Sequence, residues 1–351
     1  MDRAKIINPL KRYRNMIVLF VVLVLVVVLA ASSSDEFVLA MQELDQISGW
    51  HILGVLAMMV AFLALDGYLM HYPITNNELL YQQSFRINLA GCFFSAVTPY
   101  NAASHPSRLY YLYKHSVPAE HAMTGLLVKG FTYQIVIVVL GLVALVFSDH
   151  LIVNLENYKA ILWIGFLYNV GLTIFSYLLA TSHKFSEWII RIVIVLSKKK
   201  NMQKLQKNEA EIINSIREFY RWMSVYLKTK HKFFWMLFVT TIKVLLFYAI
   251  PIVILHGFGF DVKEHIVELL SLSALTSIVI ATVPLPGGIG AAIGVFVVLF
   301  GLVYNNSNQV DSLTISLVVW RFFTYYLLVA AGLVAAVLLQ IRTNKIEKMK
   351  V

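Results

Sequence analysis

Five ionisable side chains fall inside or beside long apolar runs of this sequence, where charge is costly. Asp66, Lys129, Lys243 and Arg321 lie within such runs, and Arg108 follows a shorter one. A charge deep in hydrocarbon costs roughly 2.5–3.5 kcal/mol, so each group needs a partner or water. Asp66 is the only acid of the five. This imbalance predicts a cavity that attracts an anionic ligand.

The phosphate of a membrane lipid is the most accessible anion for such a cavity. Arginine binds phosphate through two parallel hydrogen bonds, and lysine binds it as a compact point charge. We therefore predict that four cations contact the headgroup of a substrate lipid: Arg108, Lys129, Lys243 and Arg321. In the alternative readings Lys129 snorkels to the membrane surface, or Asp66 forms a structural pair with Lys129 or Arg86.

Two stretches interrupt apolar sequence with helix-breaking residues. One contains Thr98 and Pro99, and residues 284–290 contain two prolines and three glycines. Freed backbone groups are tolerated in a membrane only where protein buries them or a wet cavity receives them. The predicted site therefore also includes Thr98, Pro99, Pro284, Pro286, Gly287, Gly288 and Gly290. The alternative is a tight turn between two ordinary spanning helices.

Composition sets the fold class. The chain has 351 residues, of which 59% are hydrophobic and 14% charged, with a mean hydropathy of +0.73. Soluble proteins carry about a quarter charged residues, so we predict an all-α polytopic membrane protein. Cys92 is the only cysteine, which excludes an internal disulfide. The net charge of +10 is concentrated in short segments, so it does not indicate a nucleic-acid-binding surface.

Apolar runs long enough to cross a bilayer predict about six full spans. The first could instead be a signal peptide, but further spans follow, which favours a retained helix. Two shorter broken segments, residues 73–121 and 266–304, each begin and end on one side of the membrane. We predict that they are re-entrant or broken hairpins entering from opposite sides, as in an inverted repeat. The predicted spans are residues 16–31, 50–70, 122–147, 160–179, 233–255 and 313–339.

The distribution of basic residues predicts how these spans are oriented in the membrane. Of 29 Lys and Arg residues, 24 lie in residues 1–15, 73–121, 182–232 and 341–351. The positive-inside rule places these segments, and both termini, in the cytoplasm. Residues 182–232 are basic and amphipathic, which indicates a helix on the membrane surface or on the bundle. We treat residues 1–351 as one integral membrane domain that includes this segment.

Three motifs follow one another in a set order along the chain. They are Thr98-Pro99 with Arg108-Leu109-Tyr110, the proline-glycine run at 284–290, and residues 321–326, which lead to Gly332. Across roughly residues 10–340 this set resembles the flippase-like membrane domain of the lysylphosphatidylglycerol synthases, or multiple peptide resistance factors, and of their stand-alone relatives.

The resemblance implies a bacterial cell-membrane protein that moves an aminoacylated or glycosylated lipid between leaflets. In this family the lysyl-transfer chemistry resides in a separate cytoplasmic domain. We expect this chain to lack that domain, to have no lysyltransferase activity and to need no cofactor or metal. Relatives often have a glutamate at the position of Ile293 and an acidic residue beside the base at Lys129-Gly130. Both changes remove negative charge, which favours an anionic phospholipid or a glycolipid over a lysyl lipid.

Two other function classes compete with a lipid transporter. An enzyme would need a catalytic or metal-binding cluster, and His105, His115, His121 and Glu120 match no metal-ligand spacing. A membrane scaffold would recruit a lipid-modifying enzyme through residues 197–232. Apart from the lipid, the expected partner is such an enzyme or a second copy of this chain in a homo-oligomer. The sequence contains no ATP-binding loop, so active transport would need an ion gradient or a partner.

Overall fold

The computed structural model describes most of the chain after residue 46. The described ranges are residues 47–74, 79–98, 101–153, 159–198, 206, 209–283, 291–304 and 310–349. Every regular element within them is a helix, which confirms the predicted all-α class. The first predicted span, residues 16–31, lies outside the described residues.

Within the described ranges, five helical segments are long and apolar enough to cross a membrane. They match the remaining five predicted spans. The last is one continuous rod made of two α-helices joined by a π-helix. The five are α3 (Gly49–His71), α6 (Ala119–Phe147), α8 (Lys159–Thr181), α12 (Lys230–Gly257), and α15 (Val310–Arg321) with η6 (Phe322–Tyr326) and α16 (Leu327–Met349).

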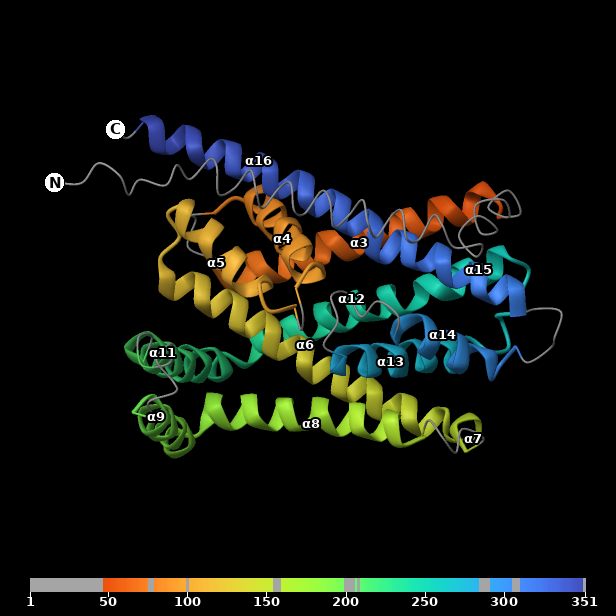
Figure 1. Cartoon of the computed structure of the whole chain (residues 1–351), viewed down its shortest axis with the longest axis horizontal. Coiled ribbons are helices and arrows are strands. Elements are labelled where there is room, and N and C mark those ends of the chain that lie inside the picture. Colours follow the sequence, from red (N-terminus) through yellow and green to blue (C-terminus); the bar gives the residue numbers. More distant parts are fainter. Residues whose placement is uncertain are drawn as a thin grey trace.

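Each predicted broken segment contains two short helices. The first follows η2 (Tyr72–Ile74) and consists of α4 (Tyr81–Ala96) and α5 (Ser104–Lys114). The second consists of α13 (Ile266–Thr282) and α14 (Ala291–Gly301). At 1.5 Å per residue, α4 and α13 extend about 24 and 26 Å, less than the ~30 Å of a hydrocarbon core. The two pairs occupy opposite halves of the bundle along its long axis (Figure 1).

The last helical rod contacts both broken segments. Its α15 part packs on α12 and α14, and its α16 part packs along α4. Gly332 permits the second contact, because a Cβ at this position would lie 2.7 Å from the Leu89 carbonyl oxygen of α4. The main hydrophobic core lies among α3, α6, α12, α13, α14 and α15, and includes Phe296 and Phe300.

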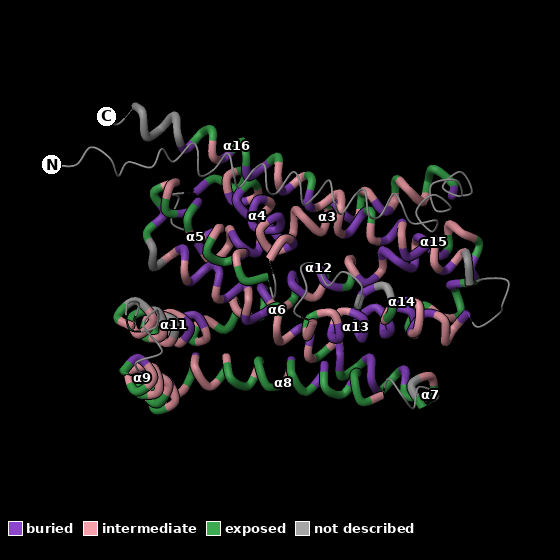
Figure 2. The backbone as a smooth tube through the Cα atoms, in the orientation of Figure 1, coloured by how far each residue is buried: buried purple, intermediate pink, exposed green. Residues whose placement is uncertain are grey.

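Helix α8 forms one edge of the bundle. Much of this helix is coloured as exposed (Figure 2). Its exposed large apolar side chains include Ile164 and Leu167. An apolar face of this kind is expected where a helix meets lipid rather than water. Residues 149–152 form the short helix α7 (Asp149–Ile152) just before it.

The basic segment 182–232 contains two helices at one end of the bundle. These are α9 (His183–Ser197) and α11 (Glu209–Lys228), which are seen nearly end-on where α8 runs across the view (Figure 1). Met223 and Tyr226 of α11 are buried against residues such as Leu69 and Met236. Of the two predicted locations for the amphipathic helix, α11 therefore occupies the bundle surface.

Candidate functional site

The carboxylate of Asp66 joins three transmembrane helices. It lies on α3 and is only 6% exposed. Lys129 of α6 places its Nζ 2.8 Å from Oδ2, and Lys243 of α12 places its Nζ 2.9 Å from Oδ1. Each carboxylate oxygen thus has its own ammonium partner. Both lysines are also buried.

The side-chain amide of Asn88 completes this network from α4. Its Nδ2 donates to Asp66 Oδ2 at 2.7 Å, and its Oδ1 accepts from Lys129 Nζ at 2.6 Å. Lys129 also donates to the backbone carbonyl of Asp66 at 3.1 Å. Lys129 is therefore held by three acceptors, which rules out the snorkelling alternative in this conformation.

Arg108 approaches the same network from α5. Its Nη1 donates to Ser104 Oγ at 2.6 Å, and its Nη2 lies 3.5 Å from the Asn88 carbonyl oxygen. The residue is 7% exposed, and its Nε has no hydrogen-bond partner among the described residues. Its contact with Asn88, which itself binds Asp66, brings Arg108 beside this network. The first broken segment therefore places a third cation, Arg108, beside the two lysines.

The resulting cluster, defined as Asp66, Asn88, Arg108, Lys129 and Lys243, is positively charged overall. It contains three cations and one carboxylate, an excess of two positive charges. Lys243 also faces aromatic rings, with its Nζ 4.8 Å from the centroid of Tyr133 and 5.6 Å from that of Phe62. Charge of one sign in a low-dielectric site attracts counter-ions strongly.

Arg321 lies among aromatic rings. Its guanidinium lies 5.0 Å from the centroid of the Trp320 ring and 5.9 Å from that of Tyr325. Tyr325 in turn donates its hydroxyl to the Ala96 carbonyl oxygen at the end of α4, at 3.2 Å. The structure therefore brings Arg108, Lys129 and Lys243 together, and places Arg321 with the aromatic residues around η6.

Thr98 closes the turn between α4 and α5. Its hydroxyl donates to the Phe94 carbonyl oxygen at 2.7 Å and accepts from the Ala103 amide at 3.1 Å. The other predicted positions in the two breaks lie outside the described residues: Pro99, Pro284, Pro286, Gly287, Gly288 and Gly290. The side chain of Ile293 is likewise not described.

Sequence reasoning missed Asn88 as a member of the cluster. The available signal was a polar residue directly before the apolar run 89–97, since a buried amide needs partners. The histidines considered for an enzyme are separated instead. His115 Nδ1 lies 2.8 Å from the Tyr111 carbonyl oxygen, and His121 packs edge-on against Trp222. Among the described residues no group of three or more His, Cys, Asp or Glu side chains is arranged to hold a metal.

The chain matches the model of a known protein family. The family model described as the lysylphosphatidylglycerol synthase transmembrane region matches residues 15–332. Searches of the curated proteins and of the solved structures find no match to this chain. Residues 15–332 include all of the helices that form the cluster. The chain belongs to the family of the lysylphosphatidylglycerol synthase transmembrane region.

Proposed function

We propose that this protein moves a lipid with an anionic headgroup between the leaflets of a bacterial cell membrane. The observation that carries the proposal is the excess of positive charge in the buried cluster. Structural ion pairs inside a membrane are normally balanced, because an unpaired charge is expensive there. A lipid phosphate supplies the missing negative charge.

Exchange of partners is the simplest way for the cluster to bind phosphate. Asp66 forms ion pairs with both lysines and so stabilises their charges inside the bundle. A phosphate that enters beside Lys243 would share the Lys243 ammonium with Asp66. It would also accept a hydrogen bond from the Nε of Arg108, which has no partner in the part of the chain that the structure describes. Asp66 holds the two ammonium groups in place for this exchange.

The position of the cluster favours entry from the cytoplasmic leaflet. Lys129 lies ten residues from the start of α6, about 15 Å at 1.5 Å per residue, and α6 starts at the end of the bundle where α9 and α11 lie (Figure 1). The positive-inside rule assigns that end, with both termini, to the cytoplasm.

Translocation in proteoliposomes tests the proposal. Fluorescent phosphatidylglycerol would be incorporated on both leaflets, and quencher added outside would report inner-leaflet lipid that becomes accessible. Lys243→Met should slow the process about tenfold or more, equivalent to at least ~1.4 kcal/mol in the barrier. Lys184→Met is the matched control, because Lys184 is exposed on α9.

Two results would contradict the proposal. In one, the wild-type protein does not accelerate lipid exposure for phosphatidylglycerol, lysylphosphatidylglycerol or a diacylglycerol glycolipid. In the other, Lys243→Met and Lys184→Met behave alike. Either outcome would favour the scaffold alternative.

A further inference from the structure

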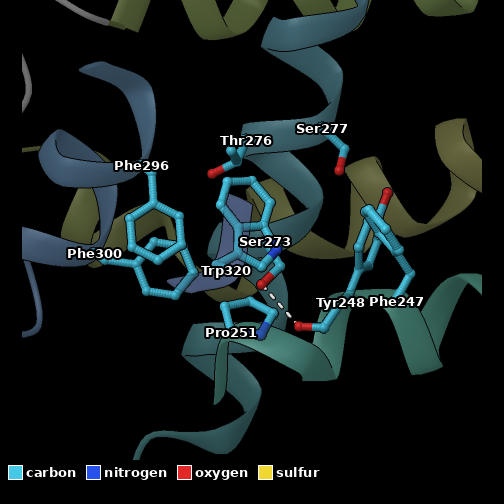
Figure 3. Close-up of a pocket in the computed structure, with 9 residues that line it drawn as sticks. All are labelled: Phe247, Tyr248, Pro251, Ser273, Thr276, Ser277, Phe296, Phe300 and Trp320. Atoms are coloured by element: carbon cyan, nitrogen blue, oxygen red, sulfur yellow. Dashed lines mark hydrogen bonds between the residues drawn. The ribbon is translucent and has the colours of Figure 1, made fainter. Parts of the chain in front are cut away.

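The interior cavity among α12, α13, α14 and α15 is too small for a ligand larger than water (Figure 3). Its volume of about 10 Å³ gives room for about one water. A water there accounts for the Trp320 indole N–H, which lines the cavity and has no hydrogen-bond partner among the described residues. A larger partner needs an open surface, and helix α9 provides one.

Helix α9 changes the direction of the chain directly after the spanning helix α8. Only Ser182 separates the two helices, and its hydroxyl accepts a hydrogen bond from the Phe185 amide at 3.2 Å, which caps the start of α9. In Figure 1 α8 runs across the view, whereas α9 is seen nearly end-on. A helix that crosses the direction of a spanning helix at its end lies along the membrane surface. The positive-inside rule assigns this end of the bundle to the cytoplasm.

Three aromatic rings connect the lipid-facing side of α8 with α9. The centroid of the Phe185 ring lies 5.6 Å from that of Phe175 on α8, and 5.6 Å from that of Trp188. Phe175 lies six residues before the end of α8, about 9 Å along the helix. This side of α9 therefore faces back toward the membrane. Phe175 and Trp188 are 42% and 54% exposed, as is typical of aromatic residues at the boundary between hydrocarbon and headgroups.

Cations alternate with apolar side chains along one exposed side of α9. We define the α9 stripe as Trp188, Arg191, Val195 and Lys198, which follow one another at intervals of three or four residues and are all exposed. This spacing places them on one face of a helix. Lys198 is the C-cap residue and keeps helical backbone angles. On the opposite face, Ile190 is only 2% exposed, so α9 presents the stripe outward.

The two cations of the α9 stripe are available to a partner outside the bundle. Glu187 is the only acidic residue of α9, and its Oε1 lies 3.7 Å from Nε of Arg217 on α11. The Glu187 carboxylate is thus directed to the neighbouring helix. Arg191 and Lys198 form no ion pair with any residue that the structure describes. The stripe is therefore positively charged and complementary to an anionic surface.

We propose that the α9 stripe binds anionic headgroups of the leaflet on which α9 lies. Trp188 and Val195 enter the edge of the hydrocarbon, while Arg191 and Lys198 remain at the level of the phosphates. The two cations are seven residues apart, about 10.5 Å along the helix, so they contact separate headgroups. A soluble acidic protein fits less well, because the ring contacts with Phe175 continue the stripe into the lipid-facing side of α8.

A dye at position 195 tests this proposal in the full-length protein. In Val195→Cys the new thiol replaces an exposed side chain, whereas the native Cys92 is buried, and labelling of the parent protein gives the background. The labelled protein would be placed in nanodiscs of phosphatidylcholine, with or without phosphatidylserine. Phosphatidylserine should shift the dye emission to shorter wavelength and protect the dye from acrylamide, a neutral aqueous quencher. Added salt should reverse both effects.

A pair of charge variants shows whether the stripe causes this response. Arg191→Gln with Lys198→Gln should lower the ratio of protected to accessible dye about twentyfold, since each cation near an anionic surface contributes about fivefold. Arg221→Gln with Lys228→Gln is the matched control on α11. It removes the same two residue types at the same spacing, and both are exposed. The control should keep the response to phosphatidylserine.

Three results would overturn the proposal. In the first, phosphatidylserine does not protect the dye, which would leave the stripe open to water and to a soluble partner. In the second, the two double variants lose the response equally, which would assign it to net charge. If Val195→Cys does not fold, hydrogen exchange of residues 188–198 replaces the dye, and unchanged protection with phosphatidylserine is the third. None of these measurements requires lipid movement, so they are independent of the proposed transport.

Discussion

Gly91 of α4 and Arg108 of α5 fit together across the first broken segment. A Cβ at position 91 would lie 2.6 Å from Cγ of Arg108, so only glycine allows the guanidinium to reach the cluster past α4. The lack of a side chain at position 91 therefore determines where the Arg108 guanidinium lies. This contact leads directly to the first prediction.

Gly91→Ala should displace Arg108 from the cluster. Overpacking of this kind costs typically about 1–3 kcal/mol, and anionic lipid binding should weaken at the same time. Unfolding in a denaturing detergent measures the first effect, and titration with phosphatidylglycerol measures the second. Gly171→Ala is the matched control: Gly171 also lies within a helix, but nothing is found within 4 Å of a Cβ there. Equal behaviour of the two variants would show that Arg108 does not depend on Gly91.

Asp66→Asn should destabilise the protein severely. Removing one partner of a buried ion pair leaves uncompensated charge and typically costs about 3–5 kcal/mol. In the double variant Asp66→Asn with Lys243→Met, part of that loss should be recovered, because one of the stranded cations is gone. A double-mutant cycle of unfolding free energies measures this coupling. Strictly additive effects would mean that Asp66 and Lys243 do not interact.

Asn88→Asp should change the charge preference of the site without changing its shape. A second carboxylate next to Lys129 reduces the excess positive charge from two to one. The affinity for phosphatidylglycerol should fall about tenfold, equivalent to ~1.4 kcal/mol. The affinity for lysylphosphatidylglycerol should rise. Asn88→Leu serves as the uncharged comparison. A parallel loss for both lipids would mean that structure, and not charge, was altered.

Arg321→Ala should separate binding from movement. Arg321 lies over Trp320 and Tyr325 and not on Asp66, and a cation–π contact contributes about 0.5–2 kcal/mol. We expect nearly unchanged phosphatidylglycerol binding, a modest loss of stability and slower translocation. Loss of binding as large as that of Lys243→Met would instead place Arg321 in the headgroup site.

Met223→Ala tests the contact of α11 with the bundle. Met223 is fully buried, and truncating a buried methionine costs about 2–5 kcal/mol. We expect a lower free energy of unfolding and faster proteolysis of α11. Arg221→Ala on the exposed face of the same helix should have little effect. If Met223→Ala were neutral, α11 would lie on the lipid surface instead.

The sequence predicted the spans well because each is a long apolar run between polar segments. The five spans within the described residues, such as 122–147 and 233–255, coincide with helices. The broken segments were also identifiable, because Pro99 and the prolines and glycines at 284–290 cannot continue a helix. The orientation of the helices, that is, which of their ends are cytoplasmic, remains a prediction from the positions of the basic residues.

The composition of the site was harder to predict. Charge in apolar runs pointed to Lys129 and Lys243, and the structure joins both to Asp66. Sequence alone offered only pairwise alternatives for Asp66, because contacts between helices far apart in the chain depend on packing. For the same reason it did not separate Arg321 from the other cations, or find the pocket around Trp320.

The π-helix between α15 and α16 has a consequence for how the two halves of the protein move. One extra residue in a turn rotates everything after it by about 100°, since an α-helix has 3.6 residues per turn. This rotation lets a single rod present one face to α14 and a different face to α4. A change in the tilt of the rod is therefore felt by both broken segments at once. We therefore expect the two broken segments to be coupled reciprocally through this rod, so that a shift of one changes the packing of the other.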